Sequence, residues 1–129
     1  KGRPTGSLVA DRSGQVTAYA LQQLADRGEF FVEPGAETYE GMVVGANSRD
    51  EDMDVNITKE KKLTNMRSAT ADATVTLQKA RTLSLDEAIE FCDEDECVEV
   101  APEAMRVRKI ILDATERGRA RSRAKQKNN

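Results

Sequence analysis

Residues 59–73 interrupt the apolar patterning of this chain and constrain its fold more than any other segment. They show neither the alternation typical of a half-buried strand nor the spacing of about 3.6 residues typical of an amphipathic helix. We therefore predict a loop. Loops of this length are uncommon inside compact domains, and those that occur are usually functional or disordered.

Alternating apolar residues flank the predicted loop on both sides. Residues 53–57 alternate between apolar and polar side chains before it, and residues 73–77 do so after it. Such alternation predicts half-buried strands. We expect the two strands to be the arms of a long hairpin or of a crossover connection.

Other apolar segments predict further short strands. They cover residues 8–10, 30–32, 42–45, 97–100 and 105–109. Residues 16–24 fit two patterns at once, so we expect a strand that runs into a helical turn and stops at Gly28. Residues 110–112, which read Ile-Ile-Leu, are expected to complete the core.

The clearest helix signal begins at Ser84. Glu87 follows three positions later, which is the spacing of a capping box, and apolar residues come next. Asp86 and Glu87 also suit the positive end of a helix dipole. We predict a helix over residues 85–93.

Together these elements predict an α+β fold with mostly antiparallel β-strands, barrel-like or in a meander, one or two short helices and a long basic loop. A chain of 129 residues has the size of one domain. We expect that domain over residues 1–112 and a basic tail over residues 113–129. The tail is expected to be partly helical or disordered, because it contains no apolar residue larger than Ala that could dock it. The chain begins at Lys1 rather than Met, which suggests that it was cut from a longer protein.

A formal net charge of -3 hides a strong segregation of charge. Residues 82–105 contain nine acids and no Lys or Arg, whereas residues 106–129 contain nine cations and two acids. Affinity for phosphate follows the local potential rather than the charge of the whole chain. A chain of this composition can therefore still bind RNA.

The predicted loop is basic and polar. Its cations and hydrogen-bonding side chains are Lys59, Lys61, Lys62, Thr64, Asn65 and Arg67. Cations with hydrogen-bonding neighbours suit a phosphate backbone. The alternative is a solvated, mobile loop whose lysines serve only solubility.

The sequence offers little support for catalysis or metal binding. It contains no His, the commonest general base, and neither of the usual glycine-rich phosphate-binding motifs. Without His, the thiols of Cys92 and Cys97 cannot complete a usual four-ligand zinc site, and we interpret both as small core residues. The acids between them lack the spacing of a calcium loop and are expected to form a solvated face.

Several uninterrupted runs are similar to one family of proteins. They read RGEFF at residues 27–31, YEGMVVG at 39–45, KKLTNMR at 61–67 and LSLDEAIEF at 83–91. These runs resemble the C-terminal domain of the TypA/BipA family of translational GTPases, which are relatives of elongation factor G. The resemblance extends from residue 6 to residue 121 and departs at Glu60, where the family often has Gly, and at residues 67–70.

The resemblance implies a ribosome-binding module that reaches into the ribosomal A site, with roles in stress-responsive translation and ribosome assembly. The family's basic loop is expected near large-subunit rRNA and the acceptor arm of A-site tRNA. That role carries onto Lys59, Lys61, Lys62, Asn65 and Arg67. The predicted RNA-binding set is completed by Thr64, Arg117, Arg119, Arg121 and Arg123.

The same resemblance implies that catalysis lies elsewhere. GTP and magnesium are expected in N-terminal domains that this chain lacks, so we expect no cofactor, catalytic residue, metal or small-molecule substrate here. We also expect a monomeric domain of cytoplasmic location. No membrane segment is expected, because no apolar run approaches the length of a membrane span.

A protein-interaction domain is the alternative function, with the acidic helix face that includes Glu90 and Asp93 as its working surface. Salt separates the two hypotheses. RNA affinity falls steeply as salt rises because counterions are released on binding, whereas an interface built on apolar contacts responds little.

Overall fold

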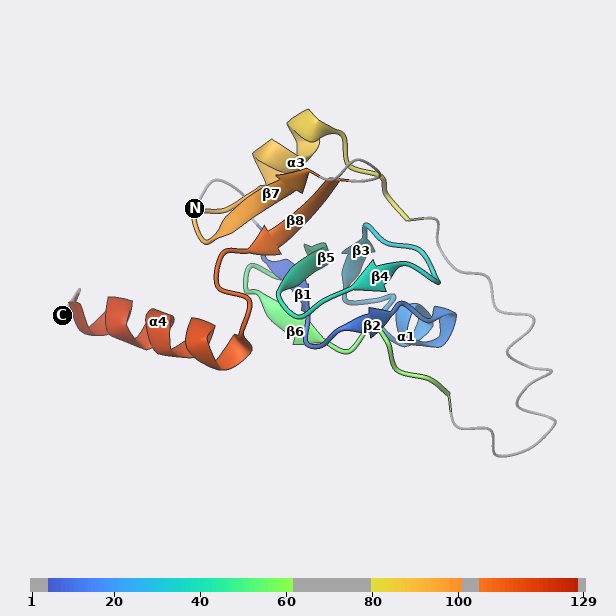
Figure 1. Ribbon diagram of the computed structural model, residues 1–129, viewed down its shortest axis with the longest axis horizontal. Coiled ribbons are helices and arrows are strands. Elements are labelled where there is room, and N and C mark those ends of the chain that lie inside the picture. The colour runs from blue at the N-terminus through green and yellow to red at the C-terminus, as the bar shows by residue number, and fades with distance from the viewer. Residues whose placement is uncertain (1–4, 62–79, 101–104, 128–129) are drawn as a thin grey trace.

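The computed structural model describes residues 5–61, 80–100 and 105–127 and is built around one mixed sheet (Figure 1). Its six strands are β1 (Ser7–Ala10), β3 (Gly28–Phe30), β5 (Met42–Asn47), β6 (Met53–Val55), β7 (Glu96–Val100) and β8 (Met105–Lys109). The order across the sheet is β6, β1, β5, β8 and β7, and β3 also pairs with β5. A second, two-stranded sheet joins β2 (Gly14–Gln15) to β4 (Glu37–Thr38).

The strand pairs are antiparallel except for β1 and β6, which run parallel. β7 pairs with β8 along its whole length, from Glu96 opposite Lys109 to Val100 opposite Met105. The described strands do not close into a barrel. The prediction of an α+β fold with mostly antiparallel strands is confirmed.

The described helices are α1 (Ala18–Gln23), α3 (Leu85–Phe91) and α4 (Ala114–Lys127). The predicted capping box is confirmed, because Ser84 and Glu87 each accept a hydrogen bond from the other's backbone N–H. For residues 16–24, the predicted helical turn is confirmed and the predicted strand is wrong. Thr17 accepts a hydrogen bond from the N–H of Ala20 at 3.1 Å and so begins the helix there.

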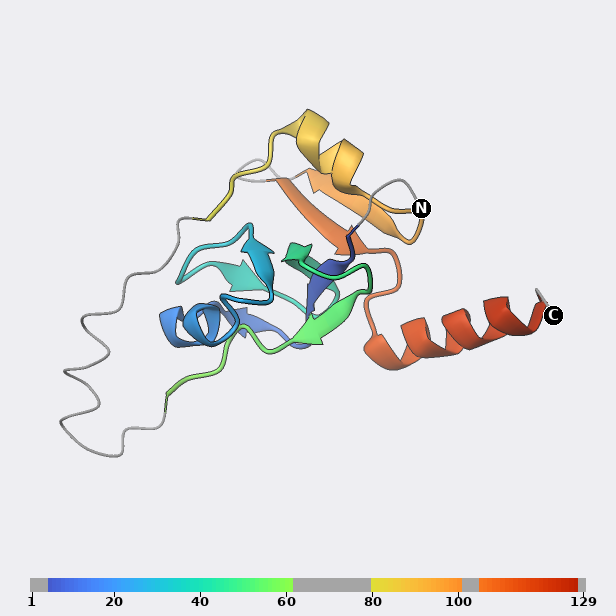
Figure 2. The same cartoon turned by 180° about the vertical axis from the view of Figure 1, so that it is seen from behind.

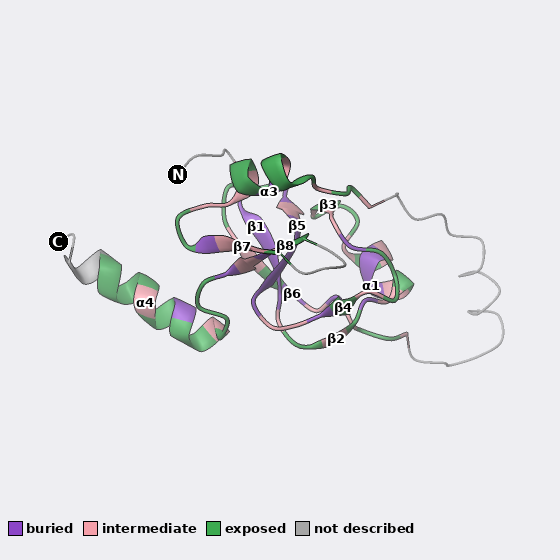
Figure 3. Ribbon diagram, turned by 45° about the horizontal axis from the view of Figure 1, so that its top comes forward, coloured by how far each residue is buried: buried purple, intermediate pink, exposed green. Residues whose placement is uncertain are grey.

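Side chains alternate across the sheet and build a core on each face. The first core consists of Leu8, Ala10, Val16, Leu21, Val32, Met42, Val44, Val55 and Ile57. The second consists of Val9, Val43, Ala88 and Val107. α3 covers this second face, where the rings of Phe31 and Phe91 meet edge to face at 5.2 Å. Figure 3 shows the buried residues concentrated in the sheet and α4 largely exposed.

The chain leaves the sheet after Lys109, and this departure overturns one prediction. Ile110, Ile111 and Leu112 do not complete the core, because 56%, 40% and 38% of their surfaces are exposed. Of the two states predicted for the tail, the helix is observed, and α4 projects away from the sheet (Figures 1 and 2). The strand predicted over residues 73–77 lies outside the described residues.

None of the helices in the described part of the chain combines the length and the apolar character that crossing a bilayer requires.

Candidate nucleic-acid interface

The structure describes only the start of the predicted basic loop, residues 59–61. Lys59 is exposed and Lys61 is half-buried. The remaining predicted loop residues, Lys62, Thr64, Asn65 and Arg67, lie outside the described residues.

The entry to the loop is fixed against the start of α1. The hydroxyl of Thr17 donates to the carbonyl oxygen of Lys59, and the N–H of Thr17 donates to the carbonyl oxygen of Ile57 at 3.1 Å. Ile57 itself is fully buried in the first core. Thr17 therefore has two tasks, since it caps α1 and holds the last residues before the loop.

The description of the chain resumes at residue 80, and Arg81 is held there between β3 and α3. Its N–H donates to the carbonyl oxygen of Phe30 at 2.9 Å, and its guanidinium pairs with Glu29 at 3.0 Å and with Glu87 at 2.8 Å. The hydrogen bond from Arg81 lowers the pKa of Glu87, with help from the N–H of Ser84. Both ion pairs are exposed and therefore contribute little to stability. They connect residue 81 to β3 and to α3.

α4 begins at a capping residue that sequence reasoning missed. The carboxylate of Asp113 accepts a hydrogen bond from the N–H of Glu116 at 2.9 Å, which satisfies one of the unpaired donors of the first turn. An acid followed three residues later by Glu could have revealed this start. Ala, Arg, Lys and Gln, which all favour helices, make up most of the helix that follows.

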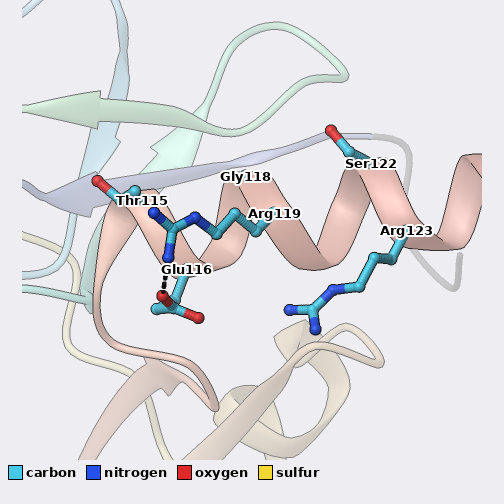
Figure 4. Close-up of a pocket in the computed structure, with 6 residues that line it drawn as sticks. All are labelled: Thr115, Glu116, Gly118, Arg119, Ser122 and Arg123. Atoms are coloured by element: carbon cyan, nitrogen blue, oxygen red, sulfur yellow. Dashed lines mark hydrogen bonds and ion pairs between the residues drawn. The ribbon is translucent and has the colours of Figure 1, made fainter.

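The four tail arginines differ in their surroundings. Arg117 is buried and donates to Asp54, whereas the other three are exposed. Arg119 pairs with Glu116 at 2.8 Å, and Figure 4 shows Arg119 and Arg123 along the same side of α4. The prediction that nothing docks the tail is therefore wrong, because a buried arginine ties it to β6.

A buried lysine is the other feature that sequence reasoning missed. Only 1% of the surface of Lys109 is exposed, and its ammonium lies 2.9 Å from both Asp95 and Glu96 and also contacts Asp52. The buried Glu96 accepts a further hydrogen bond from the hydroxyl of Ser7. Burial lowers the pKa of an ammonium, but the hydrogen bonds to the three carboxylates prevail and raise the pKa of Lys109.

This cluster also accounts for part of the acidic segment that was predicted to be a solvated face. Carboxylate oxygens of Asp52, Asp95 and Glu96 lie within 4.8 Å of one another, close enough to hold a metal ion. The ammonium of Lys109 contacts all three carboxylates. The sequence could have indicated that Lys109 points to the same side as Met105 and Val107, because the three residues occupy alternate positions of one strand.

An acid-lined hollow of about 570 Å³ opens beside this cluster. It is lined by Asp50, Glu51, Asp52, Asp93, Glu94 and Asp95, and by Arg121 from α4. Thus one of the predicted RNA-binding arginines faces a concentration of negative charge. A phosphate group approaching on that side meets like charge.

Two arginines of β8 lie on the opposite face of the sheet and share one acid. Glu99 lies 3.6 Å from Arg106 and 3.5 Å from Arg108, and it accepts a hydrogen bond from the hydroxyl of Tyr39 at 3.1 Å. Burial, with help from the bond to Glu99, raises the pKa of Tyr39 to about 12. These arginines are therefore partly neutralised within the protein.

Comparison with known proteins adds independent findings. The family model described as TypA/BipA C-terminal domain matches residues 5–114 and so ends at the first residue of α4. A protein of Bacillus subtilis named large ribosomal subunit assembly factor BipA is 51% identical over 124 residues, which are 96% of this chain and 20% of that protein. A protein of the same name from Synechocystis is 44% identical, over 84% of this chain and 18% of that protein. Another from Salmonella typhimurium is 45% identical, over 92% of this chain and 19% of that protein. The chain spans about a fifth of the length of these curated relatives.

Proposed function

This chain belongs to the TypA/BipA family, whose C-terminal domain it contains, and from this premise we propose that it is the ribosome-binding module of a translational GTPase. The relatives are named as assembly factors of the large ribosomal subunit, which makes that subunit the proposed partner. The proposed contacts are with large-subunit rRNA and A-site tRNA. GTP and magnesium are proposed to bind outside this chain, in a protein that works in the cytoplasm during ribosome assembly and stress-responsive translation.

One observation carries this proposal. A chain with a net charge of -3 exposes Lys59 at the start of the predicted basic loop and Arg119 and Arg123 on a projecting helix. Many of the remaining cations are engaged with acids of the protein itself, as Lys109, Arg117 and Arg81 are. Exposed cations are the groups that can replace counterions on a phosphate backbone.

The chain is held against the body of the protein before residue 62 and after residue 79, which supports a specific role for the loop. Thr17 holds the carbonyl of Lys59 on one side, and Arg81 is bonded to Phe30, Glu29 and Glu87 on the other. Fixed ends restrict the region that the loop cations can reach. We propose that Lys59, Lys61, Lys62, Asn65 and Arg67 contact rRNA and tRNA phosphates from this base.

A neutralised loop tests the proposal. We expect the combined variant Lys61→Gln, Lys62→Gln and Arg67→Gln to bind large ribosomal subunits more weakly in sedimentation assays. The slope of log affinity against log salt is expected to fall by roughly 0.7 to 0.9 for each lost phosphate contact. Replacing Glu90 and Asp93 of the acidic face by Gln and Asn is the control and should leave the slope unchanged. An unchanged slope in the loop variant, with its thermal midpoint intact, contradicts the role of the loop.

A second candidate function has its own observation. Leu85 and Ile89 lie one turn apart on α3, and 46% and 56% of their surfaces are exposed beside the acids of the same helix. Exposed apolar groups with a charged rim are typical of protein interfaces. If this face binds a protein of the large subunit, replacing Leu85 and Ile89 by Ala weakens subunit binding without changing its salt dependence.

A further inference from the structure

The arginines of α4 fall on two opposite faces of the helix. Residues four apart on a helix share a face, whereas residues two apart do not. One face carries Arg117, Ala120 and Arg121, which line a hollow of about 330 Å³ against Ile110, Ile111 and Asp95. The other face presents Arg119 and Arg123 together with Thr115, Glu116 and Ser122 (Figure 4). Within the described residues, the body of the protein therefore meets only one of the two pairs of arginines.

Arg117 determines which face of α4 meets the body of the protein. Its guanidinium is 8% exposed and donates to the carboxylate of Asp54 at 2.7 Å. It also donates to the carbonyl oxygens of Leu112 at 2.6 Å and Ile111 at 3.2 Å, in the link between β8 and α4. One side chain thus ties the helix to the edge strand β6 and shapes the turn from which the helix departs.

The start of α4 is fixed by the β4–β5 link as well. The carboxylate of Glu40 accepts a hydrogen bond from the N–H of Ala114 at 3.3 Å. Gly41 has a φ of +92°, and a Cβ at this position would lie 2.7 Å from the Cα of Leu112. The backbone approaches so closely there that the junction has little room to shift.

The two faces of α4 also differ in electrostatic surroundings. Arg121 lines the acidic hollow formed by residues 50–52 and 93–95. Arg119 is 67% exposed in its side chain and Arg123 is exposed, and the acid paired with Arg119 is Glu116 of the same helix. Phosphate can therefore approach Arg119 and Arg123 without meeting the acids that surround Arg121.

We propose that Arg117 is a positioning residue: its bonds to Asp54 and to the β8–α4 link hold α4 so that Arg119 and Arg123 face RNA. This inference rests on the proposed RNA-binding function. It assigns the phosphate contacts of α4 to Arg119 and Arg123, and it assigns to Arg117 and Asp54 the task of orienting them.

Asp54→Ala tests the proposal in the 129-residue chain. Backbone ¹⁵N relaxation should show that α4 tumbles with the sheet in the parent chain and moves independently of it in the variant. Affinity for a synthetic RNA hairpin should fall about tenfold, the equivalent of one charged hydrogen bond lost. The direction of this change in RNA affinity is informative. Removing an acid makes the chain more positive and would by itself strengthen RNA binding.

Matched variants complete the test. Asp26→Ala removes an exposed acid beyond the end of α1 and should not weaken binding, and Asp54→Glu should restore both the relaxation pattern and the affinity. Arg119→Gln with Arg123→Gln should reduce the salt slope by roughly 0.7 to 0.9 per contact while α4 remains fixed.

The outcomes separate the two proposals. Relaxation of α4 in Asp54→Ala that matches the parent chain overturns the positioning role, whatever the RNA affinity. Equal loss of RNA affinity in Arg121→Gln and in Arg119→Gln overturns the assignment of faces. If the parent chain binds neither the hairpin nor large ribosomal subunits, the proposed function fails, and relaxation still decides the role of Arg117.

Discussion

Lys109 and Arg119 lie ten residues apart in the same basic segment, yet their surroundings are opposite. Lys109 is 1% exposed and contacts three carboxylates, whereas the side chain of Arg119 is 67% exposed and pairs with one acid of its own helix. The comparison teaches that a count of cations along the chain overstates the charge available to RNA. Cations that pair with acids to hold the fold must first be subtracted from that count.

The largest effect is expected at the buried member of this comparison. Replacing Lys109 by Met leaves Asp52, Asp95 and Glu96 without their cation, and breaking a buried ion pair from one side costs roughly 3 to 5 kcal/mol of stability. Urea unfolding measures this loss. Lys59→Met, at an exposed position, is the matched control and should stay within about 0.5 kcal/mol. If the two variants lose a comparable amount of stability, buried and exposed cations do not differ in their contribution to it.

An intermediate effect is expected at Arg117, which combines features of both groups. Arg117→Met removes hydrogen bonds to Asp54 and to two backbone carbonyls, and we expect a loss of roughly 1.5 to 3 kcal/mol in the same unfolding assay. The loss should be smaller than for Lys109, because 47% of the Asp54 side chain is exposed to water. Arg119→Met is the exposed counterpart. If it destabilises the chain as much as Arg117→Met, the difference in burial has no energetic consequence.

Alkaline pH should weaken the contacts of Lys109 with its three carboxylates before it affects the exposed arginines. The folded pKa of Lys109 lies above its ordinary value of 10.5, so its contribution is complete below that pH and is lost as pH rises through the folded pKa. Tyr39 acts in the same direction, since its pKa rises from 10.0 to about 12 on folding. Thermal midpoints are therefore expected to fall as pH increases above about 10.

Absorbance titration of the phenols checks the Tyr39 part of this prediction. The parent chain should show a component near pH 12 that is missing from Tyr39→Phe. A parent titration without that component contradicts the burial and the bond to Glu99 as causes of the raised pKa.

The smallest change in stability is expected at the exposed face of α4. Arg119→Gln with Arg123→Gln should alter the free energy of unfolding by no more than about 0.5 kcal/mol for each exposed charge removed. Circular dichroism should show α4 retained. The control is Arg12→Gln with Arg27→Gln, which removes two exposed arginines elsewhere. A marked loss of helix in the α4 variant alone would show that these arginines support the fold.

Local patterns predicted the elements whose causes are local. Ser84 and Glu87 predicted the start of α3, and alternation predicted β6 and β8, because capping and strand periodicity depend on neighbouring residues. The helix α4 could have been predicted in the same way from Asp113 and Glu116. Apolar character alone misplaced Ile110, Ile111 and Leu112, because it does not show where the chain leaves the sheet.

The roles of charged residues depend on contacts that are distant in sequence. Lys109 meets Asp52 across 57 residues, and Arg117 meets Asp54 across 63. No spacing rule relates such partners, so the sequence alone does not separate the cations that hold the fold from those exposed to solvent. The RNA-binding role of the loop residues stays a prediction, since Lys62, Thr64, Asn65 and Arg67 lie outside the described residues.

The two cores also imply an order of folding during synthesis. Every described residue of the first core lies between Leu8 and Ile57, so these residues can pack together before the basic loop leaves the ribosome. The second core needs Ala88 and Val107, and β8 must then add to the exposed edge of β5. We expect native-state hydrogen exchange to find the amides of β1 and β5 in a unit that outlasts β7 and β8. The nascent chain would thus acquire its sheet before it acquires the helix that presents Arg119 and Arg123.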